Sequence, residues 1–525
     1  MAAKAGDHKG RPYEPGAKAD DHAGRAGDRK GRPYDVIIVG AGLSGIGAAC
    51  HLERECSGRS FVILEARDSI GGTWDLFRYP GVRSDSDMHT LGYDFKPWTD
   101  AKAIADGPAI LDYVRETARE NGLMDRIRFG HRVRSARWDS DEARWTVVVD
   151  RAGEGPTEVS GNFLFMCSGY YQYEGGHMPH FEGQENFGGR ILHPQFWPET
   201  LDYTGKRVVI IGSGATAMTL APAMANTGAS VTMVQRSPTY VISRPDVDAL
   251  ANTLGKWLPA KLAYALTRWK NIAMQGMFYR QTRVRPDKVK GQLLGLVRRH
   301  LGPDYDVKTH FTPRYDPWDQ RLCLIPNADL FHAIKSGALE IVTDRIKRFT
   351  EHGLELATGR ELPADIIVTA TGLELAVMGG VTFTVDGKPV NVPDTTIYKG
   401  MMFSDVPNLA QTFGYINASW TLRADLTARY VCRLLNRMAA TGMRQCTPRL
   451  REEDRNMPRR PWIDDFSSGY MQRSMHLFPK QGDRHPWRHA QDYAVDKKLT
   501  RAAIEDGVLV LDNPAGTQTI RKRVA

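Results

Sequence analysis

The clearest pattern in the chain is a short apolar run, followed by glycines and then by an alanine-rich helical stretch. Residues 35–39 predict a buried β-strand, and residues 40–45 supply three glycines within six positions. The stretch that runs to about Glu55 predicts a helix, and residues 61–64 predict a second strand that ends in Glu65. Strand, glycine turn, helix and strand together predict one βαβ unit with parallel strands.

The same pattern returns near the middle of the chain. Residues 208–211 predict a strand, residues 212–217 hold the glycine turn, and a helix should run to about Asn226. The next strand, residues 230–234, leads into the polar residues 235–237. Two such units predict an α/β fold with two Rossmann-like dinucleotide-binding domains.

The order of the segments predicts that the second domain is inserted into the first. Apolar strands at residues 163–167 and 365–369 are each followed by a glycine turn, at Gly169 and Gly372, which would close the first domain before and after the insertion. We therefore expect a disordered leader at 1–33, the first domain at 34–190 and 365–493, the second domain at 191–364 with a helical insert at about 245–310, and a C-terminal tail at 494–525.

One stripe of the helical insert is apolar. Leu262, Leu266, Trp269, Ala273 and Met277 fall on one side of a helix whose basic residues lie elsewhere. We expect this stripe to pack against the rest of the protein. The alternative is a basic amphipathic helix that lies on a membrane surface and makes the chain a peripheral membrane protein.

Composition limits the classes of function. The 525 residues carry a net charge of +9, and no run approaches the length of about eighteen apolar residues that a membrane-spanning helix needs. The basic residues are spread along the chain without a nucleic-acid-binding signature, so we expect no nucleic-acid partner. The polar N-terminus lacks the apolar core of a secretion signal, which predicts a cytoplasmic protein. The six cysteines show neither C-x-x-C nor metal-ligand spacing, so we expect reduced structural thiols and no metal site.

The residue that follows each unit indicates which dinucleotide the unit binds. A glycine turn lets backbone N–H groups reach a pyrophosphate at a helix N-terminus. Glu65 suits ribose hydroxyls, as in FAD or NAD, whereas Arg236 and Ser237 suit the 2′-phosphate of NADPH. The nested order of the two units resembles the two-dinucleotide-binding flavoproteins, so we expect FAD in the first domain and NADPH in the second.

A motif between the two units narrows the resemblance to one family. Phe187, Gly189, His193, Trp197 and Pro198 stand at the spacing F-x-G-x-x-x-H-x-x-x-W-P. This resembles the fingerprint of the Baeyer–Villiger flavoprotein monooxygenases, which are class B flavin monooxygenases.

A second motif supports the same family. Residues 71–85 follow the longer signature G-G-x-W-x-x-x-x-[FY]-P-G-x-x-x-D. The amino-acid sequence of this segment, and that of residues 313–323, is especially similar to the ethionamide-activating monooxygenase branch. The resemblance extends from about Tyr34 to Tyr493.

The resemblance implies a set of site residues. The expected FAD contacts are Gly40, Gly42, Ser44, Gly45, Glu65, Thr73, Trp74, Asp75, Leu76, Asp85 and Val133. The expected NADPH contacts are Arg83, Ser84, Asp85, Gly212, Ser213, Gly214, Ala215, Thr216, Ala217, Met218, Arg236 and Ser237. The implied catalytic residues are Arg321, Asp85 and His193. Gln320 stands where many family members have Lys beside the 2′-phosphate, which weakens the expected preference for NADPH.

The implied activity is that of an FAD-dependent, NADPH-consuming monooxygenase. It would insert one oxygen atom from O₂ next to the carbonyl of a small ketone, through a flavin C4a-peroxide, and release an ester or lactone. Arg321, held by Asp85, would stabilise the negative charge of the reaction. The alternative is S- or N-oxygenation of sulfides, thioamides or amines, although Trp197 favours the carbonyl reaction. An alternative of another class is a flavin-binding sensor or a peripheral membrane scaffold. Nothing in the sequence specifies an oligomeric state.

Overall fold

The larger of two main sheets has nine strands in the order β20-β19-β4-β5-β6-β1-β2-β3, with β23 paired to β6. The computed structural model describes residues 32–151 and 153–514, so the expected leader lies outside the described residues except for its last two positions. The strands of this sheet are β1 (Tyr34–Val39), β2 (Phe61–Leu64), β3 (Ile127–Arg128), β4 (His131–Asp139), β5 (Arg144–Arg151), β6 (Gly155–Met166), β19 (Thr382–Val385), β20 (Lys388–Pro389) and β23 (Leu409–Gln411). Parallel pairing joins β23, β6, β1, β2 and β3, because their continuous apolar runs can be buried on both faces.

The second sheet has five strands, all parallel, in the order β13-β10-β9-β17-β8. They are β8 (Arg190–Leu192), β9 (Arg207–Ile211), β10 (Ser230–Gln235), β13 (Leu339–Thr343) and β17 (Ile366–Thr369). In sequence, all five lie between β6 and β19 of the first sheet. This confirms the α/β fold with one dinucleotide-type domain inserted in another.

The strand β17 corrects one expected boundary. The sequence pattern places residues 365–369 in the second part of the first domain, but β17 pairs with β8 and β9 of the second sheet. The return to the first sheet therefore begins after Thr369. An apolar strand followed by a glycine turn has the same sequence pattern in either sheet, so the pattern does not determine which strands β17 pairs with.

Two linkers connect the sheets and pair with each other. The chain leaves the first sheet through β7 (Tyr171–Gly176) and returns through β18 (Leu373–Leu375), and these strands form an antiparallel ribbon. The smaller strands are β11 (Val241–Arg244), β12 (Cys323–Pro326), β14 (Ile346–Thr350), β15 (Gly353–Leu356), β16 (Glu361–Pro363), β21 (Ile397–Tyr398), β22 (Met402–Phe403), β24 (Gln445–Pro448) and β25 (Leu509–Asp512).

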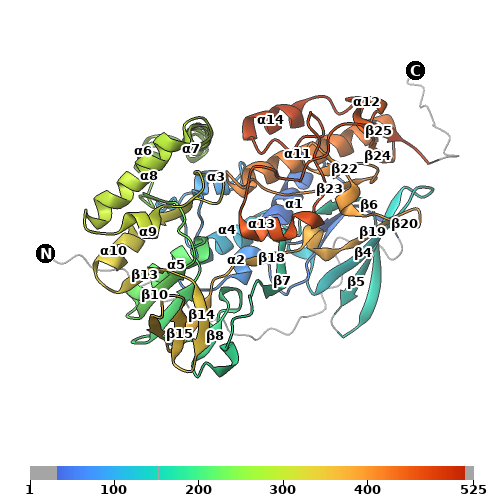
Figure 1. Cartoon of the computed structure of the whole chain (residues 1–525). Helices are drawn as coiled ribbons and strands as arrows, with labels where there is room; N and C mark the ends of the chain where they lie inside the picture. Colours follow the sequence, from blue (N-terminus) through green and yellow to red (C-terminus); the bar gives the residue numbers. More distant parts are fainter. Residues whose placement is uncertain (1–31, 152, 515–525) are drawn as a thin grey trace, which may run out of the picture. The chain divides into compact units, whose positions relative to one another are not determined.

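Helices cover both sheets (Figure 1). They are α1 (Leu43–Glu55), α2 (Thr73–Leu76), α3 (Met88–Leu91), α4 (Gly107–Glu120), α5 (Ala215–Asn226), α6 (Ala249–Trp257), α7 (Ala260–Val284), α8 (Pro286–Leu301), α9 (Val307–Phe311), α10 (Asp329–Lys335), α11 (Trp420–Thr441), α12 (Glu452–Arg455), α13 (Gly469–Ser474) and α14 (Tyr493–Arg501). Among the described residues, no helix is both long enough and apolar enough to cross a membrane.

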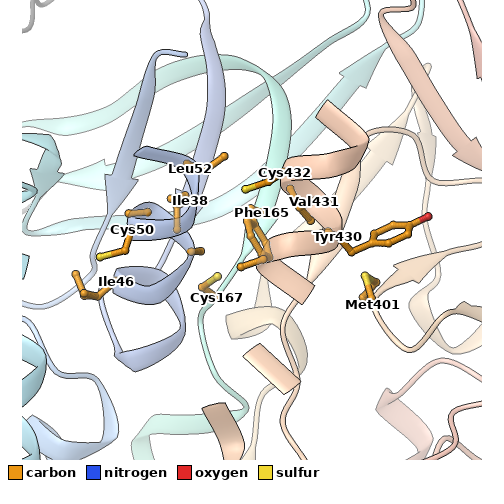
Figure 2. Close-up of a cluster of buried hydrophobic side chains, with 14 of the residues drawn as sticks. Ile38, Ile46, Cys50, Leu52, Phe165, Cys167, Met401, Tyr430, Val431 and Cys432 are labelled. Atoms are coloured by element: carbon orange, nitrogen blue, oxygen red, sulfur yellow. The ribbon is translucent and has the colours of Figure 1, made fainter. Parts of the chain in front are cut away.

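The main core lies between the first sheet and helices α1 and α11. Figure 2 shows Ile38 of β1 and Phe165 of β6 beside Leu52 of α1, with Val431 of α11 on the other side of this cluster. All six cysteines are buried and unpaired, as expected for structural thiols. Burial raises the pKa of Cys167, for example, to about 12, which keeps its thiol protonated.

Two expectations about peripheral segments are wrong. Leu262, Leu266, Trp269 and Met277 are exposed on α7 and are not buried against the described part of the chain. Periodicity finds the apolar side of a helix but does not say what covers it. The expected C-terminal tail is also part of the fold up to residue 514, since α14 packs on α11 and β25 pairs with β24.

A buried charge joins α1 to α11 and predicts a pH-dependent stability. His51 of α1 lies 3.3 Å from Asp425 of α11 and 2.9 Å from Glu55. Burial lowers the pKa of His51, but these carboxylates outweigh burial and raise the pKa to about 9. A raised pKa in the folded state stabilises the protein below the unfolded pKa of about 6.5, and this contribution disappears as the pH rises through 9.

We therefore expect His51→Gln to destabilise the protein more at pH 6 than at pH 10. The difference in unfolding free energy between wild type and variant should shrink by about 3 kcal/mol over that range. Urea denaturation across the pH series measures it, with the exposed His476→Gln as a control. A difference that does not change with pH would show that folding leaves the pKa of His51 unchanged.

Candidate functional site

A cavity of about 650 Å³ opens at the carboxyl ends of β1, β2 and β6. Its wall includes Gly40, Gly42 and Glu65 from the first sheet and its turns. The wall also includes Gly214 and Arg321, which in sequence lie between strands of the second sheet. Both predicted glycine turns therefore reach one cavity, at the position where open α/β sheets bind ligands.

The first glycine turn brings the backbone against the sheet. Gly40 has a φ of +103°, and a Cβ there would lie 2.7 Å from the carbonyl oxygen of Cys167. A Cβ on Gly45 would lie 1.8 Å from the oxygen of Gly40. No side chain caps the first turn of α1 at Gly42, which leaves its N–H groups available to a pyrophosphate.

The second turn is built in the same way but leaves more room. Gly212 has a φ of +138°, and a Cβ there would lie 2.3 Å from the oxygen of Ala370. A Cβ on Gly214 would meet nothing within 4 Å, and no side chain caps α5 at that residue. The space at Gly214 and the free N–H groups fit a second phosphate group at the cavity wall.

Glu65 stands at the end of β2 with both carboxylate oxygens engaged. One oxygen accepts a hydrogen bond from the N–H of Ala41 at 2.6 Å, and the other accepts one from the N–H of Arg67 at 2.9 Å. Burial raises the pKa of Glu65, and these hydrogen bonds oppose that shift. Because each carboxylate oxygen has two lone pairs, Glu65 can still accept from a ribose hydroxyl in the cavity.

Arg236 and Ser237 follow β10, next to the second glycine turn. Ser213 Oγ donates a hydrogen bond to the carbonyl oxygen of Ser237 at 2.9 Å, which joins the two predicted binding segments. The guanidinium of Arg236 is exposed, and no described residue binds it. The arrangement leaves one free cation beside the turn, as a 2′-phosphate would require.

Two ion pairs tie one loop of the first domain to the second domain. Arg83 binds Asp329 of α10 at 2.5 Å, and Asp85 forms an ion pair with Arg321. The other terminal nitrogen of Arg83, Nη2, is buried without a hydrogen-bond partner among the described residues. Because Arg83 lines the cavity, an anionic group of a ligand could accept a hydrogen bond from this nitrogen.

Arg321 lies among aromatic hydroxyls as well as beside Asp85. The hydroxyls are those of Tyr470, Tyr170 and Tyr171. Burial lowers the pKa of Arg321, but the Asp85 carboxylate outweighs burial and raises the pKa. Burial also raises the pKa of each of the three tyrosines, so all three hydroxyls are protonated at neutral pH. One wall of the cavity therefore carries a fixed cation and neutral O–H donors.

Most of the expected site residues meet at the cavity. Those that line it are Gly40, Gly42, Ser44, Glu65, Thr73, Trp74, Arg83, Ser84, Asp85, Val133, Gly214, Ala215, Thr216 and Arg321. Those that do not are Gly45, Asp75, Leu76, His193, Gly212, Ser213, Ala217, Met218, Arg236 and Ser237. Asp75 is instead buried among Arg67, Ser69 and Arg115, so it orients Arg67, which does line the cavity.

The expected catalytic role of His193 does not fit its position. Nδ1 of His193 accepts a hydrogen bond from the N–H of Gln195 at 3.2 Å. Nε2 lies 3.1 Å from the carbonyl oxygen of Gly372, to which it donates. Both ring nitrogens are thus engaged by backbone, and burial lowers the pKa of His193. His193 fastens the start of the second domain to the returning linker and is a positioning residue.

Sequence reasoning missed the aromatic wall. Tyr170 and Tyr171 follow the closing turn of β6, so their place at the carboxyl end of a parallel strand was a usable signal. Trp420 stacks on Tyr170 with ring centroids 5.3 Å apart and donates a hydrogen bond to Ser44 Oγ at 2.7 Å. No local pattern singles out Trp420 or Tyr470, because both reach the cavity from distant segments.

Comparison with known proteins agrees with this geometry. Residues 34–254 match the family described as flavin-binding monooxygenase-like. The FAD-containing monooxygenase EthA of Mycobacterium tuberculosis is 53% identical over 468 residues, which cover 89% of this chain and 95% of that protein. Oxidized steroid monooxygenase bound to NADP is similar in fold, with a TM-score of 0.74, 22% identity, and coverage of 92% of this chain and 100% of that one. ε-Caprolactone-bound cyclohexanone monooxygenase has a TM-score of 0.71, 18% identity, and coverage of 91% and 100%.

His193 provides a test of the positioning role. We expect His193→Ala to lower the free energy of unfolding by about 1–3 kcal/mol, because the buried N–H of Gln195 loses its acceptor and the hydrogen bond to Gly372 of the returning linker is lost. The pH dependence of turnover in the folded variant should keep its shape. His177→Ala, which changes the residue that follows β7, should alter stability little because its side chain forms no hydrogen bond with the described residues. Unchanged stability with abolished turnover would restore a catalytic role.

Proposed function

The chain belongs to the flavin-binding monooxygenase-like family, and from that premise we propose that it inserts one oxygen atom of O₂ next to the carbonyl of a ketone. The product is an ester or a lactone. The chain is a flavin-dependent, NADPH-using monooxygenase, and we place FAD at the first glycine turn and NADPH at the second. FAD, once reduced by NADPH, supplies the activation of O₂ for transfer of one oxygen atom.

The observation that carries the proposal is the ion pair between Arg321 and Asp85 at the cavity wall. Addition to a carbonyl group places negative charge on the carbonyl oxygen. A guanidinium remains protonated at every working pH and offers a planar set of donors, so Arg321 can stabilise that oxygen. Asp85 holds the guanidinium in one orientation before the substrate arrives.

The aromatic wall supports the same reaction in two ways. The hydroxyls of Tyr170 and Tyr171 lie 2.9 Å apart and stay protonated, so they can donate hydrogen bonds without adding negative charge. Their rings and that of Trp420 present apolar surface that excludes water from the cavity. Exclusion of water strengthens the interaction of Arg321 with a developing anion.

Heteroatom oxygenation is the second candidate. The amino-acid sequence of residues 71–85 is similar to that of the ethionamide-activating branch, whose substrate is a thioamide. A sulfur or nitrogen substrate develops no oxyanion at carbon, so it has less need of Arg321. Product analysis with a cyclic ketone and an aryl sulfide separates the two reactions, and NADPH consumption without any oxygenated product would support the sensor or scaffold alternative.

The proposal predicts that Arg321→Ala uncouples the enzyme. The variant should retain flavin, but ketone product should fall about 100-fold or more, the usual loss for one preorganised donor to an oxyanion. NADPH oxidation should then release hydrogen peroxide in place of product. Ester and peroxide formed per NADPH consumed give the measurement. Arg283→Ala removes an arginine that pairs with Asp319 in the same region but lies outside the cavity wall, and it should leave coupling intact. Undiminished coupling in Arg321→Ala would assign the charge to another cation.

The proposed coenzyme site predicts selectivity through Arg236. Arg236→Ala should raise the Michaelis constant for NADPH about 10- to 100-fold, because one charge-assisted hydrogen bond to the 2′-phosphate is lost. The constant for NADH should hardly change, since NADH lacks that phosphate. Arg244→Ala, another exposed arginine, is the control. Equal effects on both coenzymes would contradict the assignment.

A further inference from the structure

The outer face of α7 is apolar and exposed over most of its length. Leu262, Leu266, Trp269, Ala273 and Met277 follow one another at helical spacing, and all five are exposed. Trp269 is 72% exposed and Met277 61%. Scattered exposed apolar residues are ordinary, but a continuous row that includes a tryptophan marks a surface that binds something.

The neighbouring helix α6 also exposes apolar side chains. Its last residue, Trp257, is 83% exposed, and Leu250 on the same helix is 50% exposed. Helices α6 and α7 pack against each other, and Figure 1 shows them with α8 as one group of helices. We call the exposed apolar residues of α6 and α7 the outer face.

The opposite face of α7 is fully occupied by the rest of the protein. Arg268 donates to the carbonyl oxygens of His89 and Gly92 and pairs with Asp425 at 3.1 Å. Asn271 and Gln275 both donate to the carboxylate of Asp87. The inner face therefore fixes α7 in place, so the outer face is presented by a rigid helix.

The charge around this face has one sign. Residues 249–286 contain seven lysines and arginines and no aspartate or glutamate. Among the described residues, Lys270 pairs with Asp248 and Arg283 with Asp319 and Asp465. No described residue forms an ion pair with the four exposed basic residues, which are Lys256, Lys261, Arg280 and Arg285.

We propose that the outer face binds the surface of a membrane rich in anionic phospholipids. An apolar row with tryptophans inserts among acyl chains, and unpaired Lys and Arg side chains around it bind phosphate headgroups. A second copy of this chain fits less well, because a two-fold contact through this face would bring the same unpaired cations together. This proposal is independent of the reaction assigned to the cavity.

The test is co-sedimentation of the holoprotein with vesicles. We expect binding to vesicles of mixed phosphatidylglycerol and phosphatidylcholine, weak binding to phosphatidylcholine alone, and release from the mixed vesicles by salt. The triple variant Leu262→Ser, Trp269→Ser, Met277→Ser should bind mixed vesicles about 10-fold more weakly or worse. Replacing Lys256, Lys261, Arg280 and Arg285 with Gln should remove the preference for phosphatidylglycerol.

Matched control variants test whether vesicle binding is specific to the outer face or common to exposed apolar and basic residues. The exposed apolar residues Met124, Met178 and Val510, changed to Ser, should leave vesicle binding unaltered. The exposed basic residues Lys206, Lys335, Lys388 and Arg488, changed to Gln, should keep the lipid preference. Flavin content and turnover of a soluble substrate should be unchanged in all variants, because the inner-face contacts of α7 remain.

Two results would overturn the proposal. One is wild-type protein that does not bind the mixed vesicles at low salt. The other is binding that survives in the triple variant. If, in addition, the triple variant lowers the mass of the protein measured in solution without vesicles, the outer face is an interface between copies of the chain.

Discussion

The ion pair between Asp85 and Arg321 joins the two domains at the wall of the cavity. Both side chains are partly exposed, and pairs of this kind contribute little to stability. Its effect is geometric, since a cation beside the cavity keeps one orientation only while its carboxylate partner stays in place. The pair between Arg83 and Asp329 reinforces the same loop, so two carboxylate–guanidinium contacts set where the first domain meets the second.

The linkers impose the second constraint. Two chain crossings could act as a loose hinge, but here they pair as β7 and β18 and are fastened by His193. The motif that contains His193 and Trp197 helps to hold the linker and the second domain in place. His193 binds backbone of the returning linker, and Trp197 is buried in the core of the second domain beside Tyr203. A sequence motif can thus identify a family through residues that hold segments of the two domains together and do not line the cavity.

Sequence reasoning succeeded where the determining forces are local. Both βαβ units appear within a residue or two of their expected bounds, because apolar runs and glycine turns specify them directly. It failed where partners are distant. The sheet that receives β17, the pairing of β25 with β24 and the arrival of Tyr470 at Arg321 depend on long-range packing. The face of α7 was recognised as apolar, but its exposure depends on which of its sides the first domain occupies.

The donor geometry of Arg321 explains why this position suits arginine better than lysine. A guanidinium carries five N–H donors in one plane. The ion pair with Asp85 engages Nη2. Donors therefore remain for an oxyanion in the cavity while the group stays anchored. An ammonium has three donors around a single atom, so anchoring to Asp85 would turn most of its charge away from the substrate. Asp85 thus anchors the guanidinium through one nitrogen and leaves its other N–H donors outside the ion pair.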